Sequence, residues 1–186
     1  GYLLGSIPTG YLAGKWISGI DLREIGSGST GATNVLRHVG KGAALTVFVI
    51  DVSKGIVAVL LAGALSLGDN LQVAAGLTAL AGHIWPFWLQ WKGGKAVATG
   101  LGVLLGLSWQ VGLGCLGIFL ITLFVSKTVS ASSIIASLSL PLLMVLSFQG
   151  NFRIAYFVVS LVAMGLVIWR HRSNLRRLLA GTEPKI

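Results

Sequence analysis

The chain has 186 residues, of which 54% are hydrophobic and only 10% are charged, and its mean hydropathy is +0.86. Soluble domains carry about 25% charged residues, so this composition excludes a soluble globule and predicts that lipid surrounds much of the chain. Fourteen Lys and Arg against five Asp and Glu give a net charge of +9. In a membrane protein such an excess favours cytoplasmic loops, anionic lipid and anionic substrates over nucleic acid.

Apolar stretches of about 20 residues predict membrane-spanning helices, and we expect seven of them. They cover residues 2–18, 43–67, 71–91, 96–109, 111–125, 133–148 and 152–169. The fourth and fifth share one apolar run, which we divide around Trp109 because the polar pair Ser108 and Gln110 favours a turn. Five or six spans are the alternatives. The expected fold is an all-α, polytopic membrane helical bundle that forms a single domain over residues 1–186.

The basic residues predict the orientation of this bundle. With the first long loop in the cytoplasm, that side carries eleven of the fourteen Lys and Arg, namely Arg23, Arg37, Lys41, Lys92, Lys95, Lys127, Arg170, Arg172, Arg176, Arg177 and Lys185. The opposite side holds Arg153. The positive-inside rule therefore places the N-terminus outside and the C-terminus inside. The first span is short and begins at Gly1 without Met, which indicates that a few preceding residues are missing.

Two further patterns are typical of membrane helices. An aromatic belt is expected at the end of the third span, formed by His83, Trp85, Phe87, Trp88 and Trp91. Glycines at helical spacing are expected to be helix contacts, namely Gly100, Gly102, Gly106, Gly112, Gly114 and Gly117. These patterns explain much of the aromatic and glycine content without invoking chemistry.

The first polar cluster on the predicted cytoplasmic side is rich in glycine and hydroxyl groups. It contains Gly26, Ser27, Gly28, Ser29, Gly31, Thr33 and Asn34. Glycines allow successive backbone amides to point into one concavity, and a helix that starts near Thr33 or Asn34 adds its positive dipole. Arg37, one turn later, adds a bidentate donor. This pattern predicts a phosphate cradle, and a flexible linker that caps a helix is the alternative.

Three more polar features follow along the chain. Asp51 and Lys54, three residues apart in the second span, should pair and face the bundle interior or a water-filled cleft, in a structural role or at a site. The second cluster, Lys92-Gly93-Gly94-Lys95, combines paired charges with a backbone that an anion can approach. Ordinary juxtamembrane lysines are its alternative. In the third cluster, His171 and Asn174 share a face if the last helix continues past the interface.

Other kinds of site find no support in the sequence. The three histidines lie far apart, with no carboxylate or Cys at ligand spacing, so no metal centre is expected. A nucleophile elbow of the form Gly-x-Ser-x-Gly is absent, and Cys115 stands in an apolar run where a thiolate is not stabilised. An enzyme of this composition would position two anionic substrates at a membrane face and let them react directly.

The three clusters together resemble the motifs of the acyl-phosphate:glycerol-3-phosphate acyltransferases, the PlsY family of bacterial inner-membrane enzymes. The motifs stand here as residues 26–37, as residues 92–99, and as His171 and Asn174 with Gly181 and Glu183. Ser29 stands where the family has Asn, and Ala96 where Gly is common. The HxxxxD signature of other glycerolipid acyltransferases is missing.

The resemblance implies that an acyl group moves from acyl phosphate to the sn-1 hydroxyl of glycerol 3-phosphate, giving lysophosphatidic acid and phosphate in the first step of phospholipid synthesis. It implies no cofactor, no covalent acyl-enzyme and no obligate protein partner, with the active site at the cytoplasmic face of the inner membrane. Catalytic roles fall to His171, Asn174, Arg37 and Ser29. Phosphate contacts fall to Gly26, Ser27, Gly28, Gly31, Thr33, Asn34, Lys92, Gly93, Gly94 and Lys95.

Within this scheme, loop 92–95 is expected to hold glycerol 3-phosphate, and Glu183 to brace the C-terminal tail by pairing with a neighbouring arginine. Either His171 or a substrate phosphate acts as the general base, and the assignment of each phosphate to a loop stays open. The alternatives are a small transporter of a phosphorylated metabolite and a non-catalytic anchor for anionic lipid. A transporter should place more polar residues near the midplane of several spans.

Overall fold

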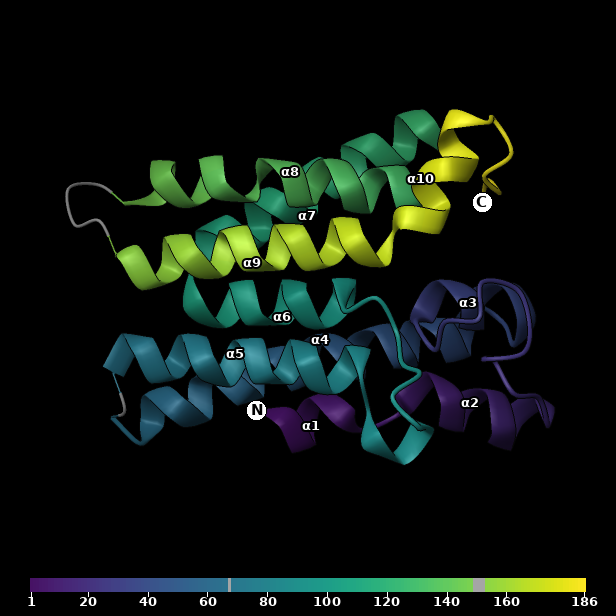
Figure 1. Cartoon of the computed structure of the whole chain (residues 1–186), viewed down its shortest axis with the longest axis horizontal. Coiled ribbons are helices and arrows are strands. Elements are labelled where there is room, and N and C mark those ends of the chain that lie inside the picture. Colours follow the sequence, from purple (N-terminus) through teal and green to yellow (C-terminus); the bar gives the residue numbers. More distant parts are fainter. Residues whose placement is uncertain (67, 149–152) are drawn as a thin grey trace. The chain divides into compact units, whose positions relative to one another are not determined.

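The structure, a computed structural model, describes residues 1–66, 68–148 and 153–186. Every regular element in these ranges is a helix, which confirms the predicted all-α fold (Figure 1). The chain divides into two compact units, residues 1–106 and 107–186. Two residues that bound predicted spans, Leu67 and Phe152, lie outside the described residues.

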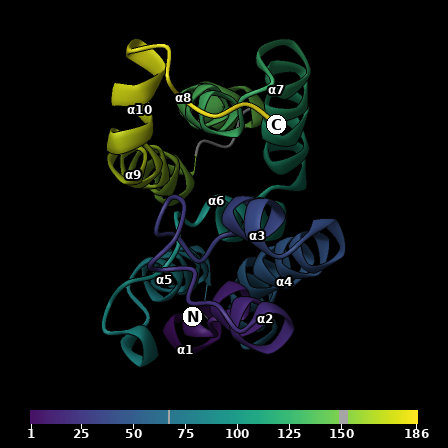
Figure 2. The ribbon, with the colours of Figure 1, turned by 90° about the vertical axis from the view of Figure 1, so that its right-hand side faces the viewer.

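The first unit is built around the long helix α4. Its elements are α1 (Tyr2–Ser6), α2 (Thr9–Ser18), α3 (Ala32–His38), α4 (Lys41–Ala64), α5 (Gly68–Ile84), the 3₁₀ helix η1 (Phe87–Leu89) and α6 (Val97–Leu107). Helices α2, α3 and α5 each pack against α4, and α1 packs along α5 (Figure 2). Helix α3 starts at Ala32, within two residues of the predicted position.

Glycines bring the backbones of this unit close together, as expected for helices in lipid. A side chain on Gly102 of α6 would meet the carbonyl of Val52 in α4, and one on Gly106 would meet Val59. The prediction of helix contacts is confirmed for these two glycines. It is wrong for Gly117, since no atom of another described element lies within 4 Å of the place that its side chain would occupy.

The predicted first span, residues 2–18, is divided into α1 and α2 by the pair Ile7–Pro8. Proline has no N–H and disfavours helical conformation in the residue before it. Ile7 accordingly adopts φ −57° and ψ 116°, and α2 begins at Thr9. The break frees the carbonyl group of Ile7 from the helical hydrogen-bond ladder, so that a side chain from another helix can bind it.

The second unit is a helical hairpin followed by a bent pair. It contains α7 (Trp109–Ser126), α8 (Val129–Ser147), α9 (Ile154–Arg170) and α10 (Arg172–Leu179). Helix α8 packs against both α7 and α9. The break predicted around Trp109 lies at Ser108, the single residue between α6 and α7. The last predicted span ends at Arg170, and a separate helix, α10, follows it after a bend of 61°.

Length and composition identify three described helices that can cross a membrane, α4, α7 and α8, and the bent pair of α9 and α10 makes a fourth. Many of their large apolar side chains are exposed, including Leu60, Leu61, Ile121 and Phe124. Lipid is the environment in which such surfaces are stable. The molecule is therefore a helical membrane protein, while the count of seven spans and the orientation stay predictions.

Candidate functional site

Loop 26–31 is folded around the side chain of Asn34, which is 2% exposed. The amide Nδ2 of Asn34 donates to the carbonyl oxygens of Leu22, Ile25 and Ser29 at 3.0, 3.2 and 3.0 Å. Its Oδ1 accepts a hydrogen bond from the backbone N–H of Ser27 at 3.4 Å. The side chain thus shapes the loop from inside, a role different from the predicted phosphate contact.

The backbone amides of this loop are also used within it. Gly28 donates its N–H to the carbonyl of Ile25 at 3.0 Å, and Gly31 donates to the hydroxyl of Ser29 at 3.4 Å. With Ser27 bound to Asn34, three of the amides expected to line a phosphate cradle point inward. These three amides are therefore engaged within the loop, and the amide cradle stays a prediction.

Two side chains of the first motif face the exterior. Ser27 and Arg37 are exposed, whereas Ser29 is buried. The catalytic role of Ser29 stays a prediction, and Ser27 is the serine of this loop that is exposed. Gly26 makes this turn possible with φ +58°, and a side chain there would collide with Asn34.

Arg23 joins this region to the segment before the second motif. Arg23 binds Asp21 through two hydrogen bonds, Nη2 to Oδ2 at 2.6 Å and Nε to Oδ1 at 3.0 Å. The side-chain hydrogen bond from Arg23 lowers the pKa of Asp21 to about 2. Arg23 also donates from Nη1 to the carbonyl of Leu89 at 3.4 Å. The segments that carry the first two motifs are thereby tied together within the first unit.

Loop 92–95 folds back onto the end of α5. Gly93 and Gly94 donate their N–H groups to the carbonyls of Ile84 and His83, at 3.1 and 3.0 Å. A side chain on Gly93 would meet the His83 carbonyl, and one on Gly94 would meet the His83 ring. These glycines are required by close packing, which differs from the predicted approach of an anion. Lys92 is exposed and Lys95 half-buried, so the lysines remain the candidate phosphate ligands.

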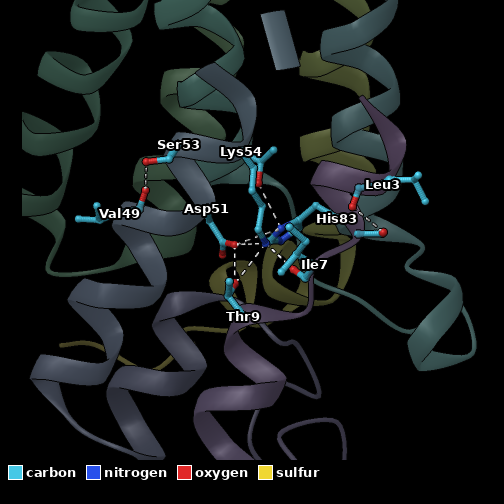
Figure 3. Close-up of polar contacts among 10 residues, drawn as sticks. Leu3, Ile7, Thr9, Val49, Asp51, Ser53, Lys54 and His83 are labelled. Atoms are coloured by element: carbon cyan, nitrogen blue, oxygen red, sulfur yellow. Dashed lines mark hydrogen bonds and ion pairs between the residues drawn. The ribbon is translucent and has the colours of Figure 1, made fainter. Parts of the chain in front are cut away.

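A buried polar cluster lies behind this loop (Figure 3). We call it the Asp51 cluster, and it consists of Thr9, Asp51, Lys54, His83 and Thr99. Asp51 Oδ1 accepts hydrogen bonds from Lys54 Nζ and Thr9 Oγ1, both at 2.6 Å. The prediction that Asp51 and Lys54 pair inside the bundle is confirmed, since their side chains are 1% and 3% exposed.

His83 completes the cluster. Its Nδ1 lies 3.8 Å from Asp51 Oδ1 and 3.1 Å from Thr99 Oγ1. The sequence-based assignment of His83 to an aromatic belt is therefore wrong, while Trp88 and Trp91 are exposed as a belt requires. Period and hydropathy do not separate a buried histidine from an interfacial one when aromatic residues follow it directly.

The third motif lies in the second unit, where α9 bends into α10. His171 occupies the junction, is buried, and has its Nδ1 2.8 Å from the carbonyl of Val167. Because a carbonyl only accepts hydrogen bonds, Nδ1 of His171 carries a proton that it donates. The side chain of Asn174, in α10, is buried as well.

Glu183 fastens the C-terminal tail to α8 and α10. Its Oε1 accepts from Asn174 Nδ2 at 2.5 Å and from Ser130 Oγ at 2.7 Å, and its Oε2 accepts from Arg177 Nε at 2.7 Å. The predicted bracing by an arginine is confirmed. Burial raises the pKa of Glu183, but these three hydrogen bonds outweigh it and hold the pKa below its usual value. The carboxylate is therefore ionised at neutral pH.

Comparison with known proteins now identifies the family. The model of the family "Glycerol-3-phosphate acyltransferase" matches residues 1–181. The chain belongs to the glycerol-3-phosphate acyltransferase family. A glycerol-3-phosphate acyltransferase of Prochlorococcus marinus (strain MIT 9313) is 72% identical over 186 residues, covering the whole chain and 91% of that protein. Another, from Parasynechococcus marenigrum (strain WH8102), is 66% identical over 186 residues and covers the whole chain and 86% of that protein.

Solved structures of the same family agree. PlsY, an integral membrane glycerol 3-phosphate acyltransferase, matches in its glycerol 3-phosphate form with a TM-score of 0.90 and 36% identity. Its lysophosphatidic acid form matches with a TM-score of 0.87 and 35% identity. Each comparison covers the whole chain and 91% of PlsY.

Ala96 stands where the resemblance sets Gly, and its backbone conformation is one that Gly adopts more easily. It adopts φ +56° directly before α6 and is buried. Glycine adopts this conformation without the contact between Cβ and the carbonyl that other residues suffer. The backbone at position 96 therefore favours Gly, the residue that the resemblance sets there.

The predicted site residues are distributed over both units. The first unit holds the loops 26–31 and 92–95, and the second holds His171, Asn174 and Glu183. Sequence reasoning missed Thr9, and it placed Thr99 at the end of the second motif without its partner His83, because both hydroxyl groups have partners that are distant in sequence. Among the described residues, no group of three His, Cys, Asp or Glu side chains is arranged to hold a metal ion.

Proposed function

We propose that this protein transfers a fatty acyl group from acyl phosphate to the sn-1 hydroxyl of glycerol 3-phosphate, without a covalent acyl-enzyme. The ester C–O bond forms as the hydroxyl oxygen attacks the acyl carbonyl, and the bond between the carbonyl carbon and the phosphate oxygen breaks. The hydroxyl proton passes to a base, and the products are lysophosphatidic acid and phosphate. The match of the whole chain to a PlsY solved in glycerol 3-phosphate and lysophosphatidic acid forms carries this proposal.

Cationic side chains provide what this reaction needs most. Both substrates carry phosphate groups, which repel each other unless cations lie between or beside them. We assign Arg37 and the hydroxyl of Ser27 to one phosphate, and Lys92 and Lys95 to glycerol 3-phosphate. Acyl phosphate has a good leaving group, so that correct placement and charge stabilisation are sufficient for transfer.

His171 and Asn174 are assigned to the attacking hydroxyl or its phosphate. The Nδ1 proton of His171 is directed to the Val167 carbonyl, which leaves Nε2 as the basic nitrogen. Either this nitrogen or a phosphate oxygen of the substrate takes the hydroxyl proton. Asn174 is held by Glu183 at 2.5 Å, so its orientation depends on the ionised carboxylate.

The same proposal includes the location, orientation and partners of the protein. Residues 1–186 form a single acyltransferase domain in the inner membrane of a bacterium, with seven spans, the N-terminus outside and the three motifs at the cytoplasmic face. Acyl phosphate, glycerol 3-phosphate and membrane lipid are its partners, and neither a cofactor nor an obligate protein partner is required. The alternative is a transporter of a phosphorylated metabolite, which would move its substrate across the membrane without changing it.

The test is a reconstitution of the purified protein in lipid with labelled glycerol 3-phosphate. Acyl phosphate, acyl-CoA and acyl-carrier protein are offered in separate reactions, and lysophosphatidic acid is measured. Product from acyl phosphate alone is expected. Product only from one of the other two donors would overturn the assigned donor, and uptake of unchanged label into vesicles without product would favour the transporter.

A pair of arginine and lysine variants tests the residue assignment. Arg37→Gln is expected to lower kcat/KM by at least about a hundredfold, since removing a charged transition-state contact costs several kcal/mol. Lys41→Gln removes a charge from the start of α4, outside the three motifs, and serves as the matched control. Equal activity of the two variants would remove Arg37 from the site.

A further inference from the structure

The burial of the Asp51 cluster costs free energy in a membrane helix bundle. Charges at such depth are costly, and even a buried ion pair is often no more stabilising than apolar side chains of equal volume. Asp51 Oδ2 in addition accepts no hydrogen bond from the part of the chain that the structure describes. Stability alone therefore does not account for the cluster, and its connections indicate what else it does.

One set of connections leads through His83 to the second motif. The His83 ring lies between Asp51 and Thr99, and Thr99 belongs to the first turn of α6. Its carbonyl accepts the N–H of Gly94 at 3.0 Å, and its Nε2 occupies the space that a side chain on Gly94 would fill. A shift of this ring therefore moves the backbone of loop 92–95.

A second set of connections leads to the first motif. Lys54 Nζ donates to the carbonyl of Ile7 at 2.5 Å and to Thr9 Oγ1 at 3.2 Å, which holds the break between α1 and α2 (Figure 3). The next residue, Gly10, packs against the carbonyl of Thr30 so closely that a side chain there would collide with it. Thr9, Thr30 and His83 also line one small cavity.

We propose that Asp51 and His83 are positioning residues that hold loop 92–95 in the conformation that binds the phosphate of glycerol 3-phosphate. This inference rests on the proposed function. Asp51 orients Lys54 and His83, and His83 supports Gly94 between the two lysines of the loop. Neither residue touches the substrate, so their effect is on the place of the loop and not on the chemistry of transfer.

Variants that keep shape but remove one contact test this role. Asp51→Asn removes the charge that holds Lys54, and Thr99→Val removes the hydroxyl that meets His83. Both should raise the KM and the Kd for glycerol 3-phosphate about tenfold, with the KM for the acyl donor changed by less than about twofold. Thr99→Ser keeps the hydroxyl and should restore wild-type binding.

Ser53→Ala is the matched control on the same helix. Ser53 is exposed and binds the carbonyl of Val49 at 2.9 Å, outside the Asp51 cluster (Figure 3). Its KM and Kd for glycerol 3-phosphate should equal those of the wild type. If Asp51→Asn does not fold, the comparison of Thr99→Val with Thr99→Ser provides the same test without removing a charge.

The outcomes separate this inference from the proposed function. Binding of glycerol 3-phosphate is measured by calorimetry on protein in lipid nanodiscs, and turnover by formation of lysophosphatidic acid. If the wild type binds and turns over while the variants lose only folded protein, with unchanged KM and Kd, the cluster is structural and the inference is overturned. If the wild type neither binds glycerol 3-phosphate nor forms product, the proposed function fails, and the inference fails with it.

Discussion

Replacing Asn34 by Asp distinguishes a residue that folds the first loop from one that binds substrate. The Nδ2 group lies 3.0, 3.2 and 3.0 Å from three carbonyl oxygens, and Asp of the same shape presents an oxygen there instead. The amide has two N–H groups, so two hydrogen bonds are lost at about 1 kcal/mol each, and repulsion between the oxygens brings the cost to about 3 kcal/mol. Opening of the loop should then become favoured by roughly a hundredfold, since about 1.4 kcal/mol corresponds to a factor of ten.

Hydrogen exchange of the substrate-free protein in nanodiscs measures this opening. Amides of residues 22–34 should exchange roughly a hundredfold faster in Asn34→Asp, while those of α7 and α8 keep their wild-type rates. Lys41→Gln, close in sequence but outside the loop, should show wild-type exchange. The reasoning is refuted if Asn34→Asp exchanges like the wild type and yet no longer binds glycerol 3-phosphate, because Asn34 would then be a ligand of the substrate.

Three further predictions concern the other motifs. Hydrogen bonds hold the pKa of Glu183 below its usual value, so the carboxylate stabilises the folded state above the unfolded pKa of about 4.3, and this stabilisation is lost as the pH falls through the lower folded pKa. Thermal unfolding of the wild type and of Glu183→Gln is compared at neutral pH and at about pH 3. The wild type should lose stability between the two pH values, and Glu183→Gln should not lose this contribution. Gly26→Ala should lower kcat/KM by at least about tenfold, since φ +58° and the collision with Asn34 together strain the loop, whereas Gly117→Ala, which adds its methyl in open space, should leave it unchanged. Gly94→Ala should bind glycerol 3-phosphate much more weakly than the wild type, because its methyl group meets the His83 ring. The double variant His83→Ala and Gly94→Ala should bind it as well as His83→Ala alone, since the smaller residue leaves room for the methyl group. Additive losses of affinity in the double variant would contradict the contact between Gly94 and His83.

The Asp51 cluster and Glu183 show two roles of a carboxylate in this fold. Glu183 lies at the C-terminal tail, accepts three hydrogen bonds, and fastens Asn174. Asp51 lies inside the helices, binds through one oxygen, and leaves the other without a hydrogen bond among the described residues. The first arrangement stabilises local structure, whereas the second is a cost that positioning of a substrate loop accounts for.

Features that depend on composition and local pattern were predictable. Apolar runs of helix length predicted the helical membrane fold, because backbone groups in lipid have to be satisfied within a helix. Spacing predicted the pair of Asp51 and Lys54, since residues three apart share a helix face. The order of the three motifs predicted the family, which the match over residues 1–181 confirms.

Features that depend on contacts between distant residues were decided by the tertiary structure alone. The place of His83 between Asp51 and Thr99, and the bond of Lys54 to the Ile7 carbonyl, each require partners from other segments. Residue type states which hydrogen bonds a side chain can make, but the packing of the helices decides which partner is within reach. The sequence by itself therefore determined the fold class, the family and the residue types of the motifs. The tertiary structure decided which of these residues face outward and which ones hold the loops in place.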